Sequence, residues 1–198
     1  AQAGKILYRI LQELKQKALP GISTAELNAF AEALIKQHHV VSSFKNYPGK
    51  KCAFPASLCT SLNEEIVHGI PKQGTILKAG DILSLDLGIW YTSTTGKNVC
   101  VDSAITLGIG DISEVAQKLI RTAEHALAIG ISCIKDGNFI NKIAKAIQTY
   151  VESQGFAVVR TLVGHGVGYR VHEPPAIPNF LEPSKNSHSG QKLKTGMT

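Results

Sequence analysis

The predicted elements of this chain occur in the same order twice. Two amphipathic helices flank Pro20-Gly21-Ile22-Ser23 in the first half, and two more flank Ile129-Gly130-Ile131-Ser132 in the second. A strand and a histidine-containing turn, His68–Pro71 and then His172–Pro175, follow each pair. Internal repetition of this kind indicates two related structural units. We therefore expect one α+β domain, residues 1–198, with two pseudo-symmetric halves over about residues 3–110 and 111–198.

Apolar residues at helical spacing predict the four helices. The first covers roughly residues 3–18, and the second begins at the capping box Ser23-Thr24-Ala25-Glu26. The third spans Ile112–Ile129, and the fourth covers roughly 139–153. The first helix is amphipathic, with Ile6, Leu7, Ile10, Leu11 and Leu14 at helical spacing. The third helix carries Val115, Leu119, Ile120, Ala123 and Leu127 on one face.

Three apolar runs predict strands: Ile82–Ile89, Val99–Leu107 and Phe156–Val163, the last of them buried. Ser57–Ile66 predicts a further strand that runs into a turn. The polar turn Thr92–Asn98 joins Ile82–Ile89 and Val99–Leu107 into a hairpin. Leu77-Lys78-Ala79-Gly80 opens this hairpin, whereas the similar Leu193-Lys194-Thr195-Gly196 is followed by only two residues. We therefore expect the chain to stop before the final hairpin of its second half.

Each strand of the hairpin carries one carboxylate, Asp86 or Asp102, in an otherwise apolar run. A buried carboxylate is costly unless it is paired or bound to a metal. Facing side chains across a hairpin are about 5 Å apart, so both aspartates could bind the same ions. Either aspartate taken alone is also compatible with a turn or capping role.

The stretch Gly164–Pro175 (GHGVGYRVHEPP) places two histidines, His165 and His172, in a glycine-rich loop after a strand. Glycines let a backbone turn sharply or approach a ligand closely. A hydrogen-bonded core role for His165 and a surface role for His172 explain the same pattern. Together with Asp86 and Asp102, however, His165 gives an oxygen and nitrogen donor set that suits Mn, Fe(II), Co or Zn.

Composition argues against a membrane-spanning protein and against a disulfide-rich secreted protein. Charged residues make up 18% of the chain, and no apolar run reaches the roughly 18 residues of a membrane span. The four cysteines show no framework spacing, which indicates free thiols in a reducing cytoplasm. The net charge of +6 comes from scattered lysines, and this scatter favours a solvated surface over a nucleic-acid-binding face. A weak contact with ribosomal RNA is compatible with the same charge.

Four motifs together resemble type I methionine aminopeptidase. They are NEEIVHGIP at residues 63–71, LSLDLG at 83–88, DSAIT at 102–106 and GHGVGYRVHEPP at 164–175. The resemblance covers residues 3–198 and implies a pita-bread fold, with a curved antiparallel sheet between the halves and an incomplete second half. Other pita-bread enzymes, such as creatinase and proline aminopeptidases, share the metal carboxylates but lack NEEIVHGIP.

The resemblance implies a role for five residues. Asp86, Asp102 and His165 would bind two divalent metal ions, with Co, Mn, Fe and Zn as candidates. His172 would hydrogen-bond the scissile amide, and His68 the main chain of the substrate. Two glutamate ligands of the family, one of them also the general base, would follow residue 198.

The methionine side chain would lie in a pocket lined by Tyr47, Phe54, Cys59 and Val171. Two of the differences from the family affect this site. Fifteen residues separate Asp86 from Asp102, where the family usually has about ten, and the Thr92–Asn98 turn can absorb the extra ones. Val171 stands where an aromatic residue is usual, which should loosen the methionine pocket.

The activity implied is removal of the N-terminal methionine from nascent chains by a cytoplasmic, monomeric metallo-aminopeptidase. The 198-residue chain would be an inactive fragment of it, because the expected glutamates are absent. The alternative is a pita-bread protein that recognises peptide or RNA without hydrolysis. Such relatives usually lose metal ligands, whereas the three expected before residue 198 and both histidines are present here.

Overall fold

The computed structural model describes residues 1–49 and 52–197, which form two compact units. The first unit contains residues 1–116 together with Gly168–Val171, and the second contains residues 117–167 and 172–197. No helix over the described residues is long and apolar enough to cross a membrane.

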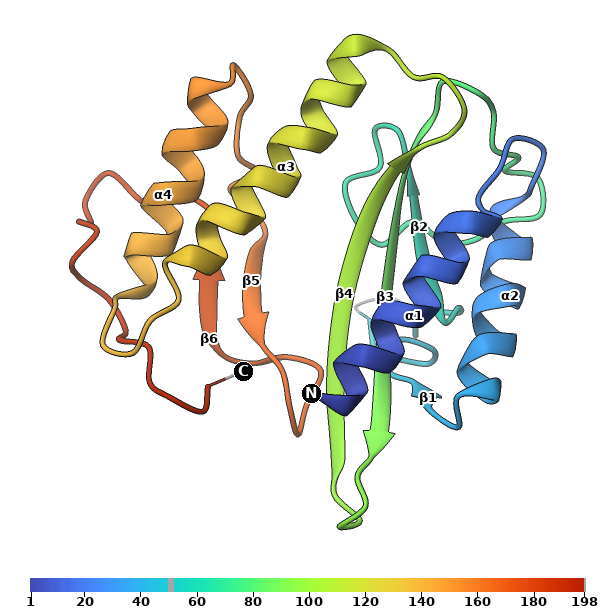
Figure 1. Cartoon of the computed structure of the whole chain (residues 1–198), viewed down its shortest axis with the longest axis horizontal. Helices are drawn as coiled ribbons and strands as arrows, with labels where there is room; N and C mark the ends of the chain where they lie inside the picture. Colours follow the sequence, from blue (N-terminus) through green and yellow to red (C-terminus); the bar gives the residue numbers. More distant parts are fainter. Residues whose placement is uncertain (50–51, 198) are drawn as a thin grey trace. The chain divides into compact units, whose positions relative to one another are not determined.

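Two helices of the first unit, α1 (Gln2–Lys17) and α2 (Thr24–Gln37), agree with the prediction (Figure 1). The capping box at the start of α2 is confirmed. The Glu26 amide donates to Ser23 Oγ at 3.1 Å, and the Ser23 amide donates to Glu26 Oε2 at 2.8 Å. These bonds satisfy amides that a helix start leaves unpaired, and the side-chain bond from Ser23 lowers the pKa of Glu26.

The sheet of the first unit is antiparallel and is built on β3 (Ile82–Thr92). One edge of β3 pairs with β4 (Asn98–Gly108). The other pairs with β2 (Leu58–Leu62) and, further along, with the two-residue strand β1 (Val41–Ser42). The predicted hairpin is therefore confirmed, with both strands slightly longer than expected (Figure 1).

The two faces of this sheet differ in chemistry because side chains alternate along a strand. On one face α1 packs on β3 and β4, and α2 packs on β1 and β2. Four β3 residues with no exposed surface form the centre of that apolar core: Leu83, Leu85, Leu87 and Ile89. Between Ile82 and Trp90, the middle of the opposite face carries small and polar residues, and we call this part the polar face; on β3 they are Ser84, Asp86 and Gly88. Ser84 and Thr106 share a hydrogen bond of 2.8 Å on it.

The second unit contains most of α3 (Glu114–Ser132), α4 (Ile140–Ser153), and the antiparallel pair β5 (Val163–Gly166) and β6 (Glu173–Pro178). Its buried core is small and consists of Ile140, Ile143 and Leu193, with Cys133, Ile147 and Ile177 packed against it. Leu193 is held there by a hydrogen bond from its amide to the Asn138 carbonyl.

One prediction for the second half was wrong, and the apolar face of its first helix is not the buried one. Of the predicted strand Phe156–Val163 only Val163 is in a strand, and Val159 and Leu162 are exposed. An apolar run becomes a buried strand only if another strand pairs with it, and no strand among the described residues pairs with residues 156–162. On α3, Val115, Leu119 and Leu127 are exposed, while Ala116, Thr122 and Ala126 are buried.

Candidate metal and substrate site

Asp86 and Asp102 lie on the polar face of one hairpin, and both are half-buried. They are not directly opposite each other, because Asp86 pairs with Ala104 and Asp102 pairs with Gly88. Diagonal neighbours of this kind lie about 7–8 Å apart, so the predicted facing pair is corrected to a diagonal pair. The five-residue turn Ser93–Lys97 fixes this register, with the Ser93 amide donating to the Lys97 carbonyl at 2.8 Å.

Gly88, opposite Asp102, leaves room on the polar face that two loop residues fill. The Ser43 amide donates to the Gly88 carbonyl at 3.0 Å, and Ser43 Oγ lies where a side chain at position 88 would begin. The Phe44 ring reaches within 2.5 Å of the same position. Sequence reasoning missed Ser43 and Phe44. The available signal was a glycine inside an apolar strand, which often marks a close approach of other groups.

Cys59 sits directly opposite Asp86 across β2 and β3, and its side chain is buried. Burial, and next the nearby Asp86 charge, raise the pKa of the Cys59 thiol to about 12. The thiol is therefore uncharged at neutral pH and behaves as a small apolar group beside the carboxylate.

Tyr47 and Phe54 are brought together by the loop between β1 and β2. The Phe54 amide donates to the Tyr47 carbonyl at 2.9 Å, and the Tyr47 amide donates to the Phe44 carbonyl at the same distance. Three aromatic residues, Phe44, Tyr47 and Phe54, thus belong to one hydrogen-bonded loop beside the polar face. Tyr47 is exposed and Phe54 is half-buried.

His68 is exposed on a loop that docks against the free edge of β2. Its backbone has a φ of 59°, an unusual value for a residue other than glycine. The next residue anchors the loop: the Thr60 amide donates to the Gly69 carbonyl at 2.8 Å, and the Gly69 amide donates to Ser61 Oγ at 3.1 Å. A side chain at Gly69 would overlap the Thr60 carbonyl, which explains the glycine.

His165 and His172 belong to the second unit, with ring centres 4.4 Å apart. His165 lies on β5 and is half-buried, and His172 is exposed just before β6. His165 Nδ1 is 3.0 Å from the Gly166 carbonyl oxygen. A carbonyl only accepts, so this hydrogen bond needs a proton on Nδ1 and leaves Nε2 as the nitrogen that could bind a metal.

The loop between these histidines includes Gly168–Val171, which group with the first unit. The Cys100 amide of β4 donates to the Gly168 carbonyl at 2.6 Å. Val171, a predicted pocket residue, is buried.

Neither unit alone, over the described residues, groups three or more His, Cys, Asp or Glu side chains closely enough to hold a metal ion. The convergence of Asp86, Asp102 and His165 therefore stays a prediction. The residues nevertheless fit a divalent metal: two half-buried carboxylates share a polar face, and the His165 tautomer suits coordination.

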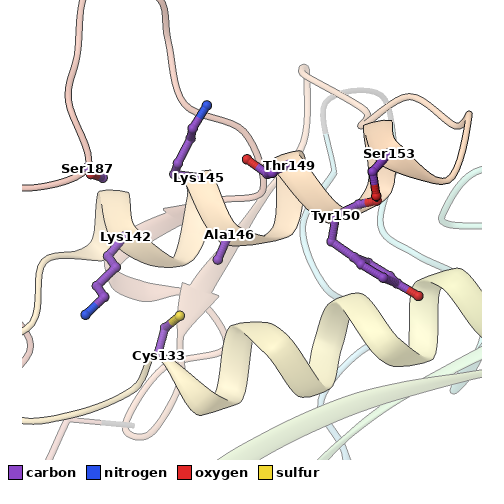
Figure 2. A pocket seen from close by; sticks show the side chains of 8 residues that line it. All are labelled: Cys133, Lys142, Lys145, Ala146, Thr149, Tyr150, Ser153 and Ser187. Atoms are coloured by element: carbon purple, nitrogen blue, oxygen red, sulfur yellow. The ribbon is translucent and has the colours of Figure 1, made fainter.

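A separate cavity of 480 Å³ in the second unit contains none of these residues (Figure 2). The residues that line it come mainly from α4 and are Cys133, Lys142, Lys145, Ala146, Thr149, Tyr150, Ser153 and Ser187. It is wide open, and the predicted chemistry does not use it.

Residues 1–198 match the metallopeptidase family M24 along their whole length. The chain belongs to this family. It is 44% identical over 196 residues to a methionine aminopeptidase of Clostridium acetobutylicum, covering 99% of this chain and 73% of that one. The crystal structure of methionine aminopeptidase from Thermotoga maritima has a TM-score of 0.88 and 35% identity, covering 98% of this chain and 73% of that one. The crystal structure of methionine aminopeptidase from Rickettsia prowazekii has a TM-score of 0.89 and 31% identity, covering 99% of this chain and 73% of that one.

These similarities confirm the resemblance to methionine aminopeptidases within family M24 and the pita-bread fold class. The chain spans about 73% of the length of these relatives, which agrees with the expected incomplete second half. Membership of a metallopeptidase family also agrees with dependence on divalent metal.

Proposed function

We propose that this protein is a metal-dependent methionine aminopeptidase that removes the N-terminal methionine from nascent polypeptides. The observation that carries the proposal is the pair of half-buried aspartates, Asp86 and Asp102, on the polar face of the hairpin in a member of family M24. Carboxylates kept on a face of small residues, away from the apolar core, are suited to binding a cation.

Asp86, Asp102 and His165 would hold two divalent ions, with Mn, Fe(II), Co and Zn all compatible with these donors. A bound metal pair supplies a water of lowered pKa and polarises the carbonyl of the peptide bond. His172 would donate a hydrogen bond to the scissile amide, and His68 would donate to the main chain of the substrate. Both histidines are exposed, which supports contact with a peptide. Donors fixed in advance stabilise the charge that develops on the amide oxygen.

The methionine side chain would lie against Tyr47, Phe54, Cys59 and Val171, next to the aspartates. The protonated thiol of Cys59 supports this assignment, because an uncharged sulfur beside Asp86 can contact an apolar side chain. Phe44 extends the same surface over Gly88 and would narrow the pocket on the Asp102 side.

The partner is then a nascent peptide with a free N-terminal methionine. We place the enzyme in the cytoplasm, since cysteines without disulfides suit a reducing compartment. We also infer that it acts as a monomer. Scattered surface lysines and a net charge of +6 support a weak contact with the ribosome.

The test uses the full-length protein, freed of metal and then supplied with Mn or Co. Met-Ala-Ser should release methionine, whereas Met-Lys-Ser should stay intact. Asp86→Asn and Asp102→Asn should each lose the activity by orders of magnitude, while Ser84→Ala, on the same face, serves as the matched control and should keep it. Peptide binding with no methionine release in the wild type would support the non-catalytic alternative and overturn the proposal.

A further inference from the structure

The hydroxyl of Ser43 is buried without a hydrogen bond. Ser43 is 5% exposed, and its Oγ has no hydrogen-bond partner among the described residues. Buried hydroxyls are nearly always satisfied, because burying an unpaired one costs free energy. The Ser43 hydroxyl is therefore available to a polar group that comes within reach of it.

The position of this hydroxyl indicates what that partner is. Ser43 Oγ occupies the place where the Cβ of residue 88 would be. Gly88 pairs with Asp102, and paired residues on one face have their Cβ atoms about 5 Å apart. The carboxylate oxygens lie two bonds beyond the Asp102 Cβ, so a rotation of that side chain brings an oxygen within reach of the hydroxyl.

We propose that Ser43 is a positioning residue of the metal site, and that its hydroxyl donates a hydrogen bond to the Asp102 carboxylate when that carboxylate binds metal. This inference rests on the function proposed above. A carboxylate that binds metal through one oxygen is oriented by a donor on the other, and such outer partners strengthen metal binding. The Phe44 ring packs beside the hydroxyl at Gly88 and shields the bond from water.

Thr60 provides a matched control within the same sheet. Its Oγ1 is also buried and without a partner among the described residues. Thr60 pairs with Leu85, however, which faces the apolar core under the helices. Its hydroxyl therefore lies on the opposite face from Asp102 and should not affect metal binding.

The experiment is a calorimetric titration of Mn into full-length, metal-free protein. Ser43→Ala should weaken the tighter Mn site at least about tenfold, as loss of an outer hydrogen bond to a ligand commonly does. Thr60→Val should leave the affinity unchanged. Without metal, the midpoint of thermal unfolding should not fall in Ser43→Ala, because the hydroxyl that it removes has no partner there.

Two results would overturn the inference. One is wild-type Mn affinity in Ser43→Ala. The other is an equal loss of affinity in Ser43→Ala and Thr60→Val, which would show a general effect of altering the sheet. Asp102→Asn separates this failure from failure of the proposed function: if it keeps wild-type affinity, or if the wild type binds no Mn, Asp102 is not a ligand and the proposed function fails as well.

Discussion

Cys59 and Asp86 are directly opposite each other across β2 and β3, so the Cys59 thiol lies beside a predicted metal ligand. Burial and the Asp86 charge together hold the Cys59 thiol in its protonated form, with a pKa of about 12. The thiolate is the reactive form of cysteine, so Cys59 should react slowly with electrophiles although it lies beside the predicted metal ligands.

The four cysteines should therefore differ in reactivity. Cys52 is exposed, whereas Cys59 and Cys100 are buried. With iodoacetamide at pH 8 the folded protein should be alkylated at Cys52 first, and Cys59 should react only after unfolding in urea. Peptide mass spectrometry of timed samples measures the order. Labelling of Cys59 as fast as that of Cys52 in the folded state would contradict the burial described here.

Gly88 should tolerate no side chain. A Cβ at this position would overlap Ser43 Oγ and the Phe44 ring, so in Gly88→Ala the side chains of Ser43 and Phe44 must move. Overpacking of this kind costs about 1–3 kcal/mol of unfolding free energy. Gly4→Ala is the control, because nothing lies within 4 Å of its added methyl group and it should leave stability equal or slightly higher. Urea unfolding compares the two variants, and equal stability of both would show that the loop does not pack on Gly88.

The features predicted correctly from sequence depend on neighbours along the chain. The capping box at Ser23 and Glu26 forms within one turn, and alternating apolar residues define β3. The diagonal placement of Asp86 and Asp102 could not be predicted, because the register depends on where the Ser93–Lys97 turn closes. Ser43 was missed for a related reason: its loop reaches Gly88 through contacts 45 positions apart in sequence.

The exposure of the apolar face of α3 has a different cause. Val115, Leu119 and Leu127 form a clear apolar stripe, but a stripe states only which residues prefer burial. The neighbouring elements decide which face is covered, and the face covered here carries the smaller Ala116, Thr122 and Ala126. A helical pattern therefore predicts the helix but not which of its faces is covered.

Burial predicts different effects of side-chain truncation at two positions of the first unit. Leu85 has no exposed surface in the core under α1, whereas Val115 is 68% exposed. Leu85→Ala should lower the free energy of unfolding by about 2–5 kcal/mol, from lost burial and the cavity left behind. Val115→Ala should change it by less than about 0.5 kcal/mol. Circular dichroism during urea unfolding measures both, and a large loss in Val115→Ala would show that this face of α3 is covered.

Glu32 of α2 should make the first unit sensitive to acid. Its pKa lies below the ordinary 4.5, mainly because Lys45 donates a hydrogen bond to its carboxylate at 2.7 Å. The Lys45 charge and hydrogen bonds from Ser57 and Asn28 lower the pKa further. A carboxyl whose pKa is lower in the folded state stabilises the fold above its unfolded pKa. That stabilisation is lost as the pH falls from 4.5 through the lower folded-state value.

Replacing Glu32 by glutamine should remove this part of the pH dependence. We expect Glu32→Gln to be less stable than the wild type at pH 7 and to approach it as the pH falls below 4.5. The gap at pH 7 should be modest, because the Lys45–Glu32 pair is substantially exposed to solvent. Thermal unfolding at steps between pH 3 and pH 7 gives the comparison. A constant gap would show that the charge of Glu32 does not stabilise the fold, because a loss that acts through ionisation must vanish once the wild-type carboxyl is protonated.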